Sequence, residues 1–113
     1  MFDSVTMKAL NVALDGLAER QRVTAQNVAN VNTPHYLAKK VSFESALAKS
    51  VAAGDGTAKL TNSYSLDETK LNGNNVNLDT ETLTNVETVL RYQFASRAVD
   101  HEFSMVRTAL RTS

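Results

Sequence analysis

Apolar residues recur at alternating steps of three and four along the N-terminal part of the chain. Two polar residues interrupt this row, and the spacing is typical of the seam of a coiled coil. Pro34 should end the helix, because it restricts the backbone of Thr33 and has no N–H to donate. We therefore predict an N-terminal helix over residues 1–34, with Asp3 or Ser4 able to cap its start. The row consists of Met7, Leu10, Leu14, Leu17, Gln21, Thr24, Val28 and Val31.

Helical periodicity returns over residues 79–113, where the chain contains no Pro and no Gly. Asp79 is a good N-cap, and Thr84 with Glu87 fits a capping box one turn later. Two apolar rows follow this C-terminal helix, so one row can meet the first helix while the other remains for a further partner. The first row is Leu83, Val86, Leu90 and Phe94, and the second is Val89, Tyr92, Ser96, Val99, Phe103, Val106 and Leu110.

Residues 35–78 form a polar segment between the two helices. Within it, Ser42–Ala53 suits a short helix that stops at Gly54, and Leu60–Leu66 alternates as a short strand or extended arm would. The run Asn-Gly-Asn-Asn at residues 72–75 favours a turn with positive φ. The expected fold class is all-α. It has two long terminal helices that form an antiparallel coiled-coil-like pair, and a short irregular middle segment that can hold a short helix and a short extended arm.

Composition narrows the classes of function. The 113 residues include twelve Lys and Arg and twelve Asp and Glu. These charges are scattered without a basic stripe, which argues against nucleic-acid binding. The chain contains no cysteine, so disulfides, thiolate metal sites and cysteine catalysis are excluded. Polar residues break up the first twenty positions, unlike a secretory signal peptide or a membrane span. Because large apolar residues are few, we expect partners to supply much of the burial.

Catalysis is disfavoured by the placement of the ionisable residues. His35 and His101 are the only histidines. Asp100 and Glu102 flank His101, so these side chains point to different faces of a helix and cannot converge on one metal or substrate. Residues 54–59 lack the spacing of a phosphate-binding loop. We expect no catalytic residue, cofactor, metal site or small-molecule substrate, and we expect the glutamates of the second helix, Glu81 and Glu87, to lie on its surface.

A polar motif lies where the first helix should end. The sequence NVANVNTPHY, from Asn27 to Tyr36, resembles the N-x-A-N-x-x-T-P-G-Y signature of bacterial flagellar axial proteins, which are the rod, hook and hook-associated subunits. Because His35 replaces the usual Gly, the turn must either accept left-handed backbone at His35 or change its geometry. The matching residues are Asn27, Ala29, Asn30, Thr33, Pro34 and Tyr36.

A second stretch narrows the resemblance to the proximal rod subunits of this family. The sequence NGNNVNLDTETLTNVETVLRYQ, from Asn72 to Gln93, is similar to theirs and ends on a Leu-x-Tyr-Gln that includes Tyr92 and Gln93. The A-Q-R-A-Y-E-A-N-like motif of other rod and hook subunits is missing near this point. The alternatives are another rod subunit of the FlgC type and a helical adaptor or inner-rod subunit of a secretion system.

The resemblance implies a structural subunit of the proximal rod of the flagellar basal body, required for swimming motility. Such subunits cross the inner membrane unfolded through the flagellar type III export gate, without a cleaved signal, and assemble in the periplasmic space. There they transmit torque and connect the membrane ring and export gate to the distal rod. The implied partners are other copies of the chain, other rod subunits, and components of the membrane ring and export gate.

The same resemblance implies that the terminal helices become ordered only when they pack into the rod. The three domains of the prediction are an N-terminal helix at 1–34, a polar arm at 35–78 and a C-terminal helix at 79–113, which together form one axial-protein domain. The residues expected in the assembly seams are Leu10, Leu14, Leu17, Val28, Val31, Leu83, Val86, Leu90, Val99, Phe103, Val106 and Leu110.

Two features of the first helix leave alternatives. Asn27 and Asn30 either bond the helix-end carbonyls or a neighbouring subunit and thereby fix the register, or they are exposed while Asn32 caps the helix. Gly16 is either a tolerated surface residue or the point at which a neighbouring helix approaches closely.

Overall fold

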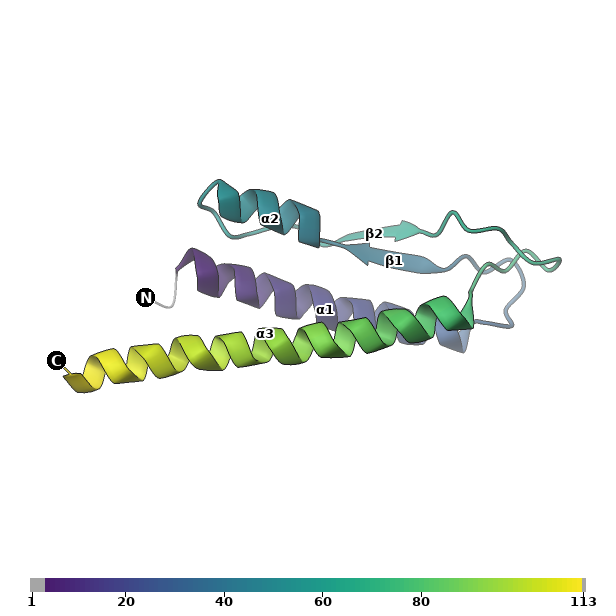
Figure 1. The fold of residues 1–113 in the computed structure, drawn as a ribbon. Helices are drawn as coiled ribbons and strands as arrows, with labels where there is room; N and C mark the ends of the chain where they lie inside the picture. Colours follow the sequence, from purple (N-terminus) through teal and green to yellow (C-terminus); the bar gives the residue numbers. More distant parts are fainter. Residues whose placement is uncertain (1–3, 113) are drawn as a thin grey trace.

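Two long helices lie side by side, and a short helix and a two-stranded sheet lie along one side of the pair (Figure 1). The computed structural model describes residues 4–112. The molecule is elongated, with principal-axis extents of 66 × 25 × 14 Å. The two long terminal helices of the predicted fold class are confirmed, whereas the small sheet means that the middle segment is not all-α. In chain order the elements are α1 (Val5–Ala29), β1 (Lys39–Ser42), α2 (Glu44–Ala52), β2 (Thr61–Tyr64) and α3 (Leu78–Thr112).

The helix α1 is the central element of the fold. It contacts α3 along its length and also contacts β1 and α2. Figure 1 shows α1 and α3 side by side, with the start of α1 and the end of α3 at the same end of the molecule. The irregular segment between β2 and α3 lies at the opposite end, next to the connection between α1 and β1.

The helix α1 begins as predicted and ends earlier than predicted. The Ser4 Oγ accepts a hydrogen bond from the Met7 N–H at 3.1 Å, which confirms Ser4 as a cap, whereas Asp3 lies outside the described residues. The helix ends at Ala29 with Asn30 as its C-cap, so it stops before Pro34. The helical bonding tightens at this point, because the Asn30 N–H is shared between the carbonyls of Gln26 at 3.2 Å and Asn27 at 3.1 Å. The Asn30 Nδ2 adds a second hydrogen bond to the Gln26 carbonyl at 2.8 Å.

The middle segment contains a two-stranded antiparallel sheet, and only one of its strands was predicted. The strand β2 and the helix α2 both fall within the ranges expected for an extended arm and a short helix. The strand β1 was not predicted. It pairs antiparallel with β2, in a register that places Lys39 opposite Tyr64 and Ser42 opposite Thr61.

The helix α3 covers the predicted range, but Asn77 rather than Asp79 caps its start. The Asn77 Oδ1 accepts from the backbone N–H groups of Asp79 at 2.9 Å and Thr80 at 3.3 Å. The predicted capping box at Thr84 and Glu87 lies inside the helix, where the Thr88 Oγ1 donates instead to the Thr84 carbonyl at 2.6 Å. Asn77 sits one residue before the first helical residue, and this is the position at which Asn is a strong N-cap.

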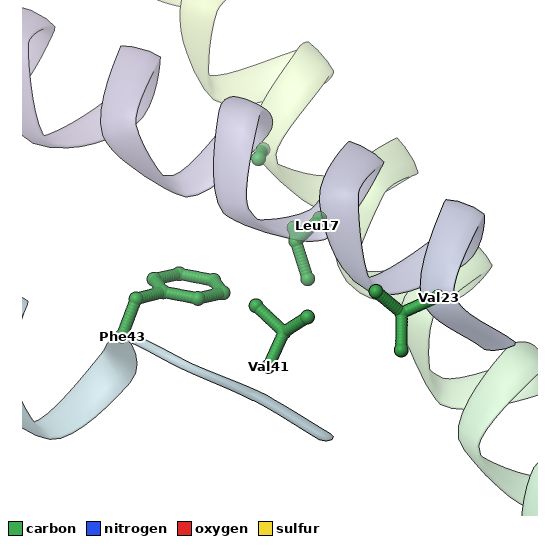
Figure 2. Close-up of a cluster of buried hydrophobic side chains, with 5 residues drawn as sticks. Leu17, Val23, Val41 and Phe43 are labelled. Atoms are coloured by element: carbon green, nitrogen blue, oxygen red, sulfur yellow. The ribbon is translucent and has the colours of Figure 1, made fainter. Parts of the chain in front are cut away.

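A small apolar cluster joins α1, β1 and α3. Leu17 and Val23 of α1 meet Val41 of β1, and Phe43 lies beside them (Figure 2). Ala95 is the member that α3 contributes. The cluster holds few side chains, which agrees with the expectation that this chain cannot build a thick core alone.

Gly16 faces this cluster and is buried. A Cβ at Gly16 would lie 2.5 Å from Cδ1 of the Phe43 ring, so only glycine leaves room for the ring. The surface interpretation of Gly16 is therefore wrong. A close approach does occur there, but the approaching group is an aromatic side chain rather than a neighbouring helix.

Candidate functional site

The end of α1 carries a buried polar cluster around Asn27, whose side chain is 1% exposed. Its Nδ2 donates to the Lys39 carbonyl at 2.9 Å and to Glu81 Oε1 at 3.1 Å. Its Oδ1 accepts from the Lys39 N–H at 3.0 Å and from the Tyr36 hydroxyl at 3.3 Å. One amide thus uses both of its donors and both of its acceptor sites, and it ties α1 to β1 and to α3.

The same helix protects the edge of β1 that faces away from β2. In an antiparallel ladder, the N–H and the carbonyl of one residue point to the same side. The Asn27 side chain hydrogen-bonds both the N–H and the carbonyl of Lys39, and Arg20 Nη2 donates to the Val41 carbonyl at 2.7 Å. Unpaired edge groups invite pairing with other chains, so these two side chains also prevent unwanted association at this edge.

Glu81 joins the cluster from α3 and is only 8% exposed. The expectation that Glu81 lies on the helix surface is therefore wrong. Burial raises the pKa of the Glu81 carboxyl, while the hydrogen bond from Asn27 and the charge of Lys40 oppose this change in part. No sequence pattern indicates this burial, because a Glu in the first turn of a helix is normally a solvated partner of the helix dipole.

Two further asparagines, Asn74 and Asn75, hold the segment before α3 against α1 and β1. Both are buried, at 0% and 4% exposure. The Asn74 Nδ2 donates to the carbonyls of Asn30 and Thr33, each at 2.8 Å, and so satisfies oxygens that the helix end leaves free. The Asn75 Oδ1 accepts from the Ala38 N–H at 2.7 Å, and its Nδ2 donates to the Ser65 carbonyl at 3.1 Å.

The predicted turn with positive φ is present at Gly73, and the contacts of Asn74 and Asn75 add a role that the prediction did not include. Gly73 has a φ of 80°, whereas neither Asn74 nor Asn75 is in the positive-φ region. Their identity is set by side-chain hydrogen bonds to distant backbone groups. The available signal was the unpaired carbonyls expected where the first helix ends, which require donors from elsewhere in the chain.

The turn after α1 keeps left-handed backbone at His35, whose φ is 63°. Of the two alternatives for the replacement of Gly by His35, this favours a turn that is kept with left-handed backbone over one with changed geometry. The His35 N–H donates to the Asn72 carbonyl at 2.9 Å, and a Cβ on Gly73 would lie 2.5 Å from His35 Nδ1. Pro34 is exposed, and Thr33 Oγ1 donates to Asn30 Oδ1 at 3.0 Å.

The two alternatives for the motif asparagines are resolved within the single chain. Asn30 bonds a helix-end carbonyl and is the C-cap, so the interpretation of Asn32 as the cap is wrong, and Asn32 is exposed. Asn27 bonds other parts of the same chain. Contact of either residue with a neighbouring subunit stays a prediction.

An ion-pair cluster joins the three helices at the other end of β1. Glu44, the first residue of α2, accepts from Arg20 of α1 through both carboxylate oxygens at 2.6 Å and from Arg91 of α3 at 2.8 Å. The Arg20 guanidinium lies 5.1 Å from the centre of the Phe43 ring. The hydrogen bonds from Arg20 lower the pKa of Glu44. No sequence pattern indicates this cluster, because its members are distant in the chain.

The outward side of α3 is apolar and open to solvent. Its exposed fractions are 60% for Leu83, 50% for Val86, 60% for Leu90 and 76% for Phe94. These residues form the first of the two predicted rows, and we call them the outward row. The face of α3 that packs on α1 instead buries small or polar side chains such as Thr88 and Ala95.

The predicted seam residues are thus divided between buried and exposed positions. In the single chain Leu17 is buried, whereas Tyr92 and Gln93 of the C-terminal motif are exposed. Tyr36 is half-buried. The remaining seam residues are half-buried at Leu10, Leu14, Val31, Val99 and Val106, and exposed at Val28, Leu83, Val86, Leu90, Phe103 and Leu110.

A groove of about 360 Å³ runs between β1 and α3, with residues of α1 at its base. Its charged lining includes the ion-paired Arg20, Glu44 and Arg91 as well as Glu81. Within residues 4–112, no group of three or more His, Asp or Glu side chains could hold a metal ion. No helix in that described range is long and apolar enough to cross a membrane.

Comparison with known proteins identifies relatives that share one name. The chain is 31% identical to the flagellar basal body rod protein FlgB of Borreliella burgdorferi, over 87% of this chain and 90% of the relative. It is 32% identical to the protein of that name from Salmonella typhimurium, over 72% of this chain and 75% of the relative. It is 28% identical to that of Bacillus subtilis, over 95% and 94%. The chain matches no protein-family model.

Proposed function

Because the chain belongs to the FlgB family of flagellar basal body rod proteins, and is therefore a structural subunit of the rod and not an enzyme, we propose that it polymerises through its terminal helices. In this proposal it builds the proximal rod, transmits torque, and connects the membrane ring and export gate to the distal rod. Swimming motility then depends on it.

The exposed outward row of α3 is the observation that supports this proposal most directly. Apolar side chains that lie 50–76% open to water on one helix face form a surface that association can bury. Burying apolar surface is worth about 25 cal/mol per Å², so a row of four large side chains contributes substantially to assembly. The neighbours that bury it would be other copies of the chain and other rod subunits.

The proposal treats α1 and α3 as an antiparallel, coiled-coil-like pair that acts as one unit in the rod. Their side-by-side position and the shared end of their chain termini support this arrangement (Figure 1). The buried Asn27, which bonds both β1 and α3, fixes how the two helices are aligned. A pair fixed in this way presents its outward faces in a constant geometry, which a regular polymer requires.

The proposal also covers the route and the place of assembly. The chain would pass through the export gate unfolded, without a cleaved signal, and join the rod in the periplasmic space. A thin core supports this, because a chain with few buried apolar side chains costs little to unfold. The absence of cysteine also fits passage into an oxidising compartment.

Deletion of the gene from the bacterium that carries it, followed by complementation, tests the proposal. A strain without the gene should not swim, and an epitope-tagged copy should restore swimming. In purified basal bodies, antibody against the tag should label the membrane-proximal end of the rod. Swimming without the gene, or label at the distal rod or hook, would contradict the proposal. Label at the distal rod would favour another rod subunit such as the FlgC type.

Circular dichroism separates a rod subunit from a helical adaptor. A rod subunit should gain helix when it assembles, so the isolated chain should show less helix than α1 and α3 together would give. An adaptor should show its full helix content alone, without flagellar components. That second result, combined with normal rods in the deletion strain, would favour the adaptor.

A further inference from the structure

The outward row of α3 cannot be covered by α1 of the same chain. Leu83, Val86 and Leu90 each lie two residues after Glu81, Thr84 and Thr88, which are buried or half-buried on the α1 side. Two residues turn a helix by about 200°. The outward row therefore points away from α1, and only another molecule can cover it.

A second exposed face, on α1, has the same spacing and carries three alanines beside the longer, polar Gln21. It consists of Ala18, Gln21, Ala25 and Ala29, all of which are exposed. We call it the small-residue face. Its steps of three, four and four are those of Leu83, Val86, Leu90 and Phe94. Both sets therefore extend over about 16 Å of helix.

The two faces are complementary in shape as well as in length. Large side chains on one helix need gaps on the facing helix, and alanines provide such gaps while letting the helix axes approach to about 8 Å. Two outward rows facing each other would instead place four large side chains against four large ones. The small-residue face offers no apolar bulk of its own and would gain little by pairing with itself.

We propose that the outward row of α3 in one copy of the chain packs against the small-residue face of α1 in the next copy. This rests on the proposed function, since it names the surfaces through which the subunits join. Because the two faces are different surfaces of one molecule, the contact is heterologous and can repeat without closing. Such a contact yields an open polymer, whereas a contact of the outward row with itself would close into a two-fold dimer.

Introduced cysteines test the contact, because the chain has no cysteine of its own. Two differently tagged copies are produced in one strain, one with Ala25→Cys and the other with either Leu90→Cys or Val86→Cys. Basal bodies are purified and oxidised, and mixed disulfides are detected by both tags. A disulfide forms only when the two Cα atoms lie within about 7 Å. A mixed disulfide between the two copies is expected, from Leu90 if the facing helices are parallel and from Val86 if they are antiparallel.

Each outcome decides between the inference and its alternatives. Disulfides in a strain that carries only Leu90→Cys would show that the row pairs with itself and would overturn the inference. Disulfides from Ala25→Cys to a different rod protein would overturn it as well. Incorporated variants that yield no mixed disulfide from either pair, in cells that swim, would overturn the inference and leave the proposed function intact. Absence of the wild-type chain from basal bodies would overturn the proposed function itself.

A second set of variants does not depend on cysteine. Ala25→Leu should fill the gap that the outward row needs, and it should reduce the amount of chain in purified basal bodies at least tenfold. Ala25→Ser keeps the small volume and should be incorporated like the wild type. The two variants should be secreted at equal levels, which separates export from assembly. Equal incorporation of Ala25→Leu and Ala25→Ser would overturn the inference.

Discussion

At the scale of single residues, Asn27 replaces the backbone of a missing neighbour strand. Its amide oxygen accepts from the Lys39 N–H at 3.0 Å, and its amide nitrogen donates to the Lys39 carbonyl at 2.9 Å. A paired strand residue would offer the same two bonds. The same amide also reaches Glu81, so one side chain connects the sheet edge with both long helices.

Asn27→Ala should therefore destabilise the fold far more than a typical surface substitution. It leaves two backbone groups of Lys39 and the carboxylate of Glu81 without this partner, and each unsatisfied buried group costs about 1–3 kcal/mol. We expect the free energy of unfolding to fall by about 3 kcal/mol, measured by urea unfolding followed by circular dichroism. Asn32→Ala, at an exposed position of the same motif, is the control and should change it by less than about 0.5 kcal/mol. Equal effects of the two changes would contradict this role for Asn27.

Glu81 makes stability depend on pH in the direction that is unusual for a carboxylate. Burial raises the pKa of Glu81 in the folded chain, so the folded state binds more protons than the unfolded state between the ordinary and the raised pKa. Stability should decrease as pH rises through that window. Glu81→Gln keeps the oxygen that Asn27 bonds and removes the charge.

We expect Glu81→Gln to raise the free energy of unfolding at pH 7, and the gain should shrink as the pH falls to about 4. Urea unfolding at several pH values measures it. Glu87→Gln, which removes an exposed charge from the same helix, controls for net charge. A gain that is independent of pH, or one that grows in acid, would be incompatible with a buried and desolvated Glu81.

At the scale of secondary-structure elements, the periodic parts of the chain were predictable and the parts held by distant partners were not. Steps of three and four located α1 and α3. The strand β1 was missed, because its stability depends on Asn27 and Arg20 of α1 and on pairing with β2. The same cause explains the missed roles of Asn74, Asn75 and Glu44, whose partners lie in other elements.

Hydrophobic periodicity also does not indicate which face of α3 packs on α1. Periodicity showed two apolar rows, but α3 buries Glu81, Thr88 and Ala95, which no apolar pattern selects. Those side chains are buried because Glu81 bonds Asn27 and Thr88 bonds its own helix. The large apolar residues of the first row are exposed to solvent. A sequence pattern alone cannot distinguish such an exposed row from one that faces the core.

The contact between α1 and Phe43 gives a prediction at this scale. Gly16→Ala places a Cβ 2.5 Å from the Phe43 ring, and the ring cannot move far because it is 3% exposed. Overpacking costs about 1–3 kcal/mol, and the better helix propensity of Ala returns only about 1 kcal/mol. We expect a net loss of up to about 2 kcal/mol in the free energy of unfolding.

Phe43→Leu provides the matched test of that contact. The smaller side chain makes room, so Gly16→Ala should cost less, or stabilise, in a chain that already carries Phe43→Leu. A double-mutant cycle measured by urea unfolding reports this coupling, which should exceed about 0.5 kcal/mol. Additive effects would mean that Gly16 and Phe43 do not limit each other.

At the scale of the whole molecule, the fold separates the side chains that hold the chain together from those that can join it to other chains. The buried cluster around Leu17, Val41 and Phe43 lies between α1 and the two-stranded sheet, and reaches α3 at Ala95. The outward row lies on the far side of α3, where Leu90 is 60% exposed. A charge placed in one group or the other should therefore have different consequences.

Leu17→Asp and Leu90→Asp make this difference measurable. Leu17 is 3% exposed, so an unpaired carboxylate there should unfold the isolated chain and thereby also prevent assembly. Leu90→Asp should leave the circular dichroism and urea midpoint of the isolated chain close to those of the wild type. It should still abolish incorporation into basal bodies and swimming, because the charge would be buried only when a neighbour covers the outward row. Thr82→Asp, at an exposed site of α3 outside that row, is the control and should support swimming. Normal swimming with Leu90→Asp would show that the outward row stays in water in the assembled rod, and that the burial on which assembly depends lies elsewhere.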